Sequence, residues 1–102
     1  MAAYEQGPED VLPDFQGPLT LDFVNWLAAG DSIVSATAEL IQLDTGLDVA
    51  TSRIGTVAVT GTQLTQTIGS LTPGREYLLR FLPVTVQGMT DPGQIKVRVG
   101  LP

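Results

Sequence analysis

The sequence predicts an all-β fold, a sandwich of two antiparallel sheets, and three observations support this prediction. Roughly six or seven short segments alternate apolar and polar residues, which is the period of a strand with one buried face. Turn residues separate these segments every ~8 to 12 positions. Helical periodicity nowhere extends far enough to cover a parallel sheet. A small sandwich is therefore the expected architecture.

Size and composition limit the chain to one packed domain. Its 102 residues are too few for a second independent core, and the absence of cysteine rules out disulfides and thiolate metal sites. No positively charged segment followed by an apolar run opens the chain, and no apolar stretch reaches the ~18 residues of a membrane span. We expect a soluble protein, made inside a cell without a standard export signal, with no membrane partner.

The charge is acidic and unevenly distributed. A net charge of -6 disfavours nucleic acid, because affinity for phosphates comes mainly from clustered lysine and arginine. Residues 1–50 carry nine acids and no base, whereas residues 51–102 carry two acids and five bases. This asymmetry permits two interpretations: acids placed for solubility, or complementary charges that meet a neighbouring subunit or a second copy.

The first seventeen residues predict an extended N-terminal arm, with the sandwich following over residues 18–102. Pro8 and Pro13 favour extended backbone, and the segment has the pattern of neither a helix nor a strand. Such an arm is either a disordered terminus or a tether that orders against a partner. Val11, Leu12 and Phe15 are the expected partner-binding residues, since a purely solvating tail has little use for them.

The next segments predict a strand, a short turn and a second strand. Alternation of Leu19, Leu21 and Phe23 with polar residues indicates the first strand. The sequence NWLAAGD then favours a helical turn capped by Asn25, so that Trp26 plugs one end of the sandwich. For SIVSATAELIQL, residues 32–43, a helix is the rival prediction, but the β-branched residues favour a strand. Its expected inward residues are Val34, Ala36, Ala38 and Leu40, whose small alanines leave room for Trp26 or Tyr77 opposite.

Two threonine-rich strands are expected after the turn at residues 44–48. Ile54, Val57 and Val59 belong to the first, and residues 63–68 return after a tight turn at Gly61. Threonines at positions 56, 60, 65 and 67 are typical of exposed or edge strands. An edge strand offers unpaired backbone groups, so pairing with a strand from a neighbour is a possible mode of assembly.

The most specific local signal is LTPGREYLLRF, residues 71–81. A leucine, a proline–glycine turn and a tyrosine that leads an alternating strand resemble the corner before strand F in immunoglobulin-like and fibronectin type III domains. In those domains the tyrosine ring enters the core and its hydroxyl bonds to nearby backbone. We therefore expect a structural tyrosine corner built from Leu71, Pro73, Gly74 and Tyr77.

The C-terminal part predicts a final hairpin. Pro83 suggests a bulge or an edge, because proline cannot donate a ladder hydrogen bond. After a turn over residues 88–93, the sequence QIKVRV should direct Ile95, Val97 and Val99 inward while Lys96 and Arg98 face water.

Residues that carry chemistry are largely missing. Without histidine or cysteine, imidazole-activated nucleophiles and imidazole-ligated metals cannot be built. The carboxylates of Asp44 and Asp48, or of Glu9 and Asp10, fall in turn or arm segments, and DTGLD lacks the alternating acids of an EF-hand. Phosphate-binding loops and aromatic stacking platforms are also absent. We expect no catalytic residues, no metal and no cofactor.

From Pro8 to Val99 the layout resembles a family of small virion proteins of tailed bacteriophages. That family has a P-x-D-V-L arm, a W-L-x-x-G-D-x-I-x-S-x-T segment, a G-x-x-Y strand and a terminal V-x-V. The matching residues here are Pro8, Asp10, Val11, Leu12, Trp26, Leu27, Gly30, Asp31, Ile33, Ser35, Thr37, Gly74, Tyr77, Val97 and Val99. The chain departs from the family pattern at Ala38 and Glu39, where an aromatic residue is frequent.

The resemblance implies a fiber-to-tail adaptor with an immunoglobulin-like fold and no enzymatic activity. Its partners would be other virion proteins, namely tail, baseplate, fiber or capsid subunits, bound by several symmetry-related copies. The protein would reside in the virion after assembly in the bacterial cytoplasm, which the lack of cysteine fits.

Three alternatives use the same sandwich differently. A capsid decoration protein would sit on the major capsid lattice, so its copy number would differ from that of an adaptor. A carbohydrate-binding module would need exposed aromatic residues, and only Tyr4 and Trp26 are candidates. A cell-surface adhesion module would call for a signal peptide.

Overall fold

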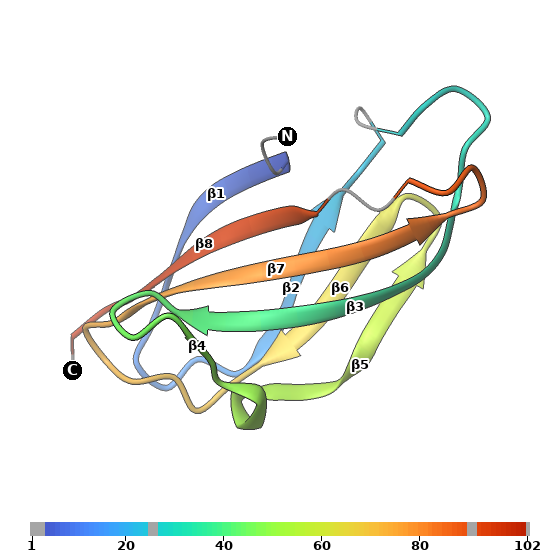
Figure 1. The fold of residues 1–102 in the computed structure, drawn as a ribbon. Helices are drawn as coiled ribbons and strands as arrows, with labels where there is room; N and C mark the ends of the chain where they lie inside the picture. Colours follow the sequence, from blue (N-terminus) through green and yellow to red (C-terminus); the bar gives the residue numbers. More distant parts are fainter. Residues whose placement is uncertain (1–3, 25–26, 90–91, 102) are drawn as a thin grey trace.

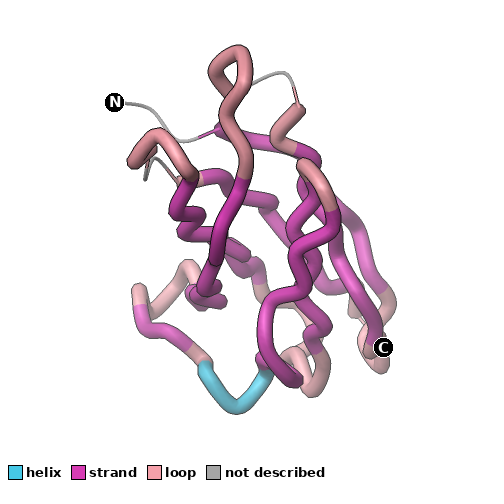
Figure 2. The backbone as a smooth tube through the Cα atoms, turned by 90° about the vertical axis from the view of Figure 1, so that its right-hand side faces the viewer, coloured by secondary structure: helices cyan, strands magenta, loops and turns pink. Residues whose placement is uncertain are grey.

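Eight strands and one short 3-10 helix make up the structure, a computed structural model that describes residues 4–24, 27–89 and 92–101. The elements in chain order are β1 (Tyr4–Val11), β2 (Gly17–Asp22), β3 (Ile33–Gln42), β4 (Leu47–Asp48), η1 (Ala50–Ser52), β5 (Arg53–Thr60), β6 (Gln63–Ile68), β7 (Glu76–Thr85) and β8 (Gly93–Val99). Strand and loop therefore account for nearly all of the described chain (Figure 2).

The strands form two facing sheets (Figure 1). Sheet A has the order β1-β8-β7-β3-β4, and sheet B has the order β2-β6-β5. If β2 to β8 are read as strands B, C, C′, D, E, F and G, the sheets become G-F-C-C′ and B-E-D, which is the arrangement of an immunoglobulin-like domain. The prediction of an all-β, two-sheet sandwich is confirmed.

The core lies between the sheets and is built by alternation along the strands. Leu79 and Phe81 of β7, Ile95 and Val97 of β8, and Leu21 of β2 have no exposed surface. Their polar neighbours point outward because successive side chains of a strand face opposite sides. The inward direction predicted for Ile95, Val97 and Val99 is confirmed, and Phe23 is equally buried just beyond β2.

The expectation that residues 1–17 contain no strand is wrong. Residues 4–11 are extended, but they form β1 and pair in parallel with β8, with Val11 opposite Val99. The register shifts between Gln6 and Glu9, so Gly7 and Pro8 fall in an irregularity of the ladder. A bulge accommodates a proline without loss of the flanking pairs. Residues 4–11 of the N-terminal segment thus form an edge strand of sheet A.

Two further irregularities redirect side chains of β3 and β5. A register shift between Ile33 and Ser35 buries Ile33 and leaves Val34 62% exposed, so the inward direction predicted for Val34 is wrong. In β5, Gly55 adopts a φ of 74° and the register shifts between Ile54 and Ala58. Ile54 and Val59 consequently remain exposed.

Pro83 does not interrupt its strand. It lies in β7 opposite Ala36 and is buried, while β8 stops pairing where Gly93 meets Phe81. No residue of β8 therefore pairs with Pro83, so the N–H that proline lacks leaves no ladder hydrogen bond unmade. The bulge predicted at Pro83 is not in β7; the register shift lies in the neighbouring strand β3, between Ile33 and Ser35.

The strand predicted over residues 32–43 is β3, so the helical alternative is wrong. The helical turn expected from Asn25, and the position of Trp26, lie outside the described residues.

Candidate binding surface

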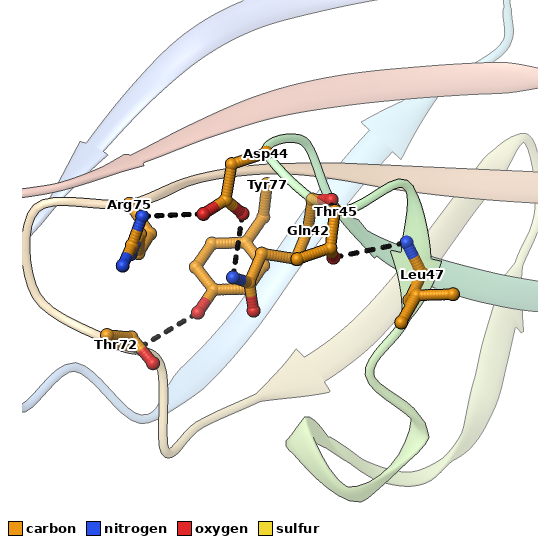
Figure 3. A network of polar contacts seen from close by, with 7 residues as sticks. All are labelled: Gln42, Asp44, Thr45, Leu47, Thr72, Arg75 and Tyr77. Atoms are coloured by element: carbon orange, nitrogen blue, oxygen red, sulfur yellow. Dashed lines mark hydrogen bonds and ion pairs between the residues drawn. The ribbon is translucent and has the colours of Figure 1, made fainter.

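The loop between β6 and β7 is fixed by the residues of the predicted tyrosine corner. Tyr77 is buried, and its hydroxyl accepts a hydrogen bond of 2.9 Å from the backbone N–H of Thr72 (Figure 3). Leu71 is buried beneath the turn, and Gly74 takes a φ of 77° that other residues rarely adopt. Leu101 lies over this turn: a Cβ added to Gly74 would be only 2.8 Å from Leu101 Cδ2.

One end of the sandwich, where β1 and β8 finish, carries an open apolar hollow. The N–H of Gly100 donates to the carbonyl of Val11 at 2.9 Å, and the Arg98 guanidinium bonds both carboxylate oxygens of Asp10, at 2.8 and 3.3 Å. These contacts hold the ends of the two strands together beside a hollow of about 390 Å³. Its lining residues are Asp10, Val11, Leu12, Arg98, Val99 and Gly100.

Of the three predicted partner-binding residues, only Leu12 has a side chain exposed enough to contact a partner. Val11 and Phe15 are partly buried and pack against the protein's own core. Leu12 is 71% exposed, and Leu101, which follows Gly100, is 78% exposed. Sequence reasoning missed Leu101, because only the parallel pairing of β1 with β8 brings the end of β1, and with it Leu12, beside the C-terminal residues. We name Val11, Leu12, Val99, Gly100 and Leu101 the β1–β8 end surface.

The basic side chains of the second half of the chain are all paired with acids within the fold. Each of the five basic residues lies within 4.0 Å of a carboxylate, and four of those carboxylates belong to the first half of the chain. The pairs are Arg53–Asp48, Arg75–Asp44, Arg80–Glu39, Lys96–Glu76 and Arg98–Asp10. No basic side chain is thus left without an acid, which weakens the hypothesis of complementary faces between copies.

At the opposite end, the loop after β2 is bonded to the loop after β7. The carboxylate of Asp31 accepts hydrogen bonds from the N–H groups of Ser32 and Gln87, at 2.9 and 3.0 Å. Burial raises the pKa of Asp31, but hydrogen bonds from the Thr85 side chain and the two backbone N–H groups outweigh it, so the pKa is lowered. Exposed Val34, Val84 and Val86 lie near this end and give it some apolar surface.

The threonine-rich strands occupy different positions in sheet B. β5 is an edge strand with Thr56 and Thr60 exposed, as predicted. β6 is the central strand, so Thr65 and Thr67 do not line an edge. The Thr65 hydroxyl instead shares a hydrogen bond of 2.7 Å with that of Thr20 on β2.

Three of the four carboxylates considered for chemistry, those of Asp10, Asp44 and Asp48, pair with basic side chains. Asp44 and Asp48 pair with Arg75 and Arg53, and Asp48 Oδ1 also accepts from the N–H of Leu40 at 2.9 Å. Within the described ranges no three histidine, cysteine or acidic residues are grouped to hold a metal. Among the same residues, no helix has the length and apolar character to cross a membrane.

A family model matches residues 13–98, most of the chain, and its description is "Podophage GP4 fiber-tail adaptor protein gp77". The chain belongs to this family. The suspected resemblance to phage fiber-tail adaptors is confirmed, and the chain is accordingly a structural bacteriophage protein and a virion component. No curated protein matches the sequence of this family member. The matched range begins after Leu12, so it contains the sandwich from the β1–β2 loop to β8 but not β1.

Proposed function

We propose that this protein is a non-enzymatic adaptor that joins a tail or baseplate subunit to a fiber subunit. The family match over residues 13–98 is the observation that carries the proposal. Several symmetry-related copies would act around the tail, after assembly in the host cytoplasm. The sandwich suits this role, because its inward apolar residues form the core and its basic side chains pair with acids of the same chain.

The β1–β8 end surface is the contact site that the proposal favours for one partner. Leu12 and Leu101 are the most exposed large apolar side chains of the described chain, and they follow residues that are bonded together. Leucines exposed in this way beside a hollow lose their contact with water when a partner covers them, and this burial favours association. Val11 shapes the hollow from below, and Phe15 supports the turn through its contact with the core.

Removal of the gene from its phage tests the proposal. Particles assembled without the protein should have filled heads and tails but should lack fibers, as judged by electron microscopy and by mass spectrometry of purified particles. Complementation with the intact gene should restore the fibers. Fiber-bearing particles formed without the protein would contradict an adaptor role, and heads of reduced stability with fibers in place would favour capsid decoration instead.

A further inference from the structure

Strand β3 has an unpaired edge over most of its length. β7 pairs with one side of β3, but β4 pairs with the other side only at Ile41 and Gln42. Next to β4, Leu40 is satisfied from the same side: its N–H donates to Asp48 Oδ1 at 2.9 Å, and its carbonyl accepts from the Val49 N–H at 2.8 Å. Between residues 33 and 39, no described strand covers this edge.

The backbone groups that face this edge belong to alternate residues. In an antiparallel ladder the N–H and C=O of one residue face the partner strand, and those of the next residue face away. The bonds of Leu40 show that its groups face away from β7, and the pairing from Ala36 to Gln42 is regular. It follows that the N–H and C=O groups of Ala36 and Ala38 also point to the open edge.

An opening between the two sheets lies directly beside these groups. It has a volume of about 150 Å³ and is lined by Ala36, Thr37, Ala38, Arg53, Gly55, Thr56, Val57 and Gln66. The bulge of β5 shapes its far wall, where the Gln66 side chain donates to the carbonyls of Ile54 and Gly55 at 3.1 and 3.3 Å. The small alanines were expected to face a large side chain, and the structure places this opening there instead.

One of the residues that line the opening, Arg53, also carries a buried donor without an acceptor. Arg53 Nε is buried and has no hydrogen-bond partner, although the terminal nitrogen of the same guanidinium pairs with Asp48 at 3.0 Å. A buried donor left unpaired costs free energy, so the fold by itself does not fully satisfy this side chain. Arg80 and Glu39 pair nearby, so the site has no uncompensated charge of its own.

We propose that the β3 edge receives an extended, uncharged segment of a neighbouring virion subunit as an added strand. Its backbone would bond to Ala36 and Ala38, and one apolar side chain would enter the opening. The opening has a volume of about 150 Å³, roughly that of a cavity that can hold benzene, so a side chain the size of leucine or phenylalanine fits. The inference rests on the proposed adaptor function.

The chain's own N-terminal segment is not the occupant. β1 already pairs with β8, at the opposite edge of sheet A from β3 and β4. The segment must also be peptide, because only an extended backbone presents donors and acceptors at the spacing of the Ala36 and Ala38 groups.

Hydrogen–deuterium exchange of residues 33–40 tests the proposal with the wild-type chain. In the free protein the amides of Ala36 and Ala38 should exchange rapidly, and in purified particles they should exchange at least about tenfold more slowly. Equally rapid exchange in particles that contain the protein would overturn this inference and leave the adaptor role intact. Particles that lack the protein would instead refute the adaptor role.

A substitution pair provides an independent test. A36P removes the outward N–H without breaking a bond to β7, and A36S keeps that N–H at similar size. If both purified proteins fold, A36P should enter particles about tenfold less than wild type, whereas A36S should enter normally. Normal incorporation of A36P would contradict strand addition at this edge, and if A36P does not fold, the exchange measurement decides.

Discussion

The backbone N–H of Thr72 lies 2.9 Å from the hydroxyl of Tyr77, five residues later in the chain. The ring of Tyr77 is only 2% exposed, so the hydrogen bond attaches the loop between β6 and β7 to the core of the sandwich. Because that loop crosses from sheet B to sheet A, this one contact helps to fix how the two sheets meet.

Replacement of Tyr77 by phenylalanine should weaken the fold without removing it. Y77F keeps the buried ring but leaves the Thr72 amide without its acceptor, so the free energy of unfolding should fall by about 1 kcal/mol. Urea denaturation followed by tryptophan fluorescence measures the difference. A variant as stable as wild type would show that the hydrogen bond contributes nothing to the corner.

A methyl group at Gly93 should be far more harmful than one at Gly17. A Cβ at Gly93 would lie 2.5 Å from Phe23 Cζ and 2.7 Å from Leu21 Cδ2, and both side chains are fully buried. Overpacking of this kind costs about 1–3 kcal/mol, so G93A should lower the thermal midpoint clearly. In the control G17A the new atom meets Phe15 at an ordinary 3.4 Å, and equal midpoints for the two variants would contradict the packing described.

Asp22 should make the stability depend on pH. The Thr62 hydroxyl donates to Asp22 Oδ1 at 2.7 Å and, with the Val24 N–H at 2.9 Å, lowers the pKa of Asp22 below its ordinary 3.8. A lowered pKa in the folded state contributes stability that is present above pH 3.8 and is lost as the pH falls through the folded value.

The variant D22N should therefore lose less stability than wild type between about pH 5 and about pH 2, a range that spans the ordinary pKa of 3.8. Denaturation at a series of pH values checks this, and T62V, which keeps the carboxylate but loses the donor, should give a pKa for Asp22 closer to 3.8 by nuclear magnetic resonance. Identical slopes for wild type and D22N would argue against the assignment.

Loss of Leu12 should impair incorporation into particles but not folding. Leu12 is 71% exposed at the β1–β8 end surface, so L12S removes little from the core while it removes apolar surface available to a partner. The matched control L47S changes a leucine that is 66% exposed on β4. Quantitative mass spectrometry of particles should show fewer copies of L12S alone, and equal incorporation of both variants would exclude this surface as a contact.

Deletion of the N-terminal segment would be a poor test of the expectation that this segment is a tether. Removal of residues 1–17 would take away all of β1 and the start of β2, and it would expose the edge of β8. A failure of the truncated protein to assemble would then report unfolding or aggregation as readily as loss of a tether.

Regular alternation and the proline–glycine turn made much of the fold predictable. β7 and β8 follow period two without interruption, and Tyr77 follows its turn at the spacing of a tyrosine corner. The failures occur at irregularities: Gly7 and Pro8 obscure β1, and the register shift in β3 turns Val34 outward. Each bulge depends on the partner strand, so a local pattern cannot show it.

The candidate site was less predictable because it depends on contacts between distant parts of the chain. Leu12 stood out as an apolar residue in a polar segment, but Leu101 gained meaning only through the bond between Gly100 and Val11. The opening beside Ala36 and Ala38 was even less apparent, since it results from the β5 bulge and the shortness of β4.

Electron cryomicroscopy of the intact virion tests the central claim most directly. The adaptor account predicts density for this sandwich between tail and fiber subunits, in symmetry-related copies, with Leu12 and Leu101 covered by a neighbour. Density for the chain on the capsid lattice, or tail and fiber subunits in direct contact without it, would contradict the account.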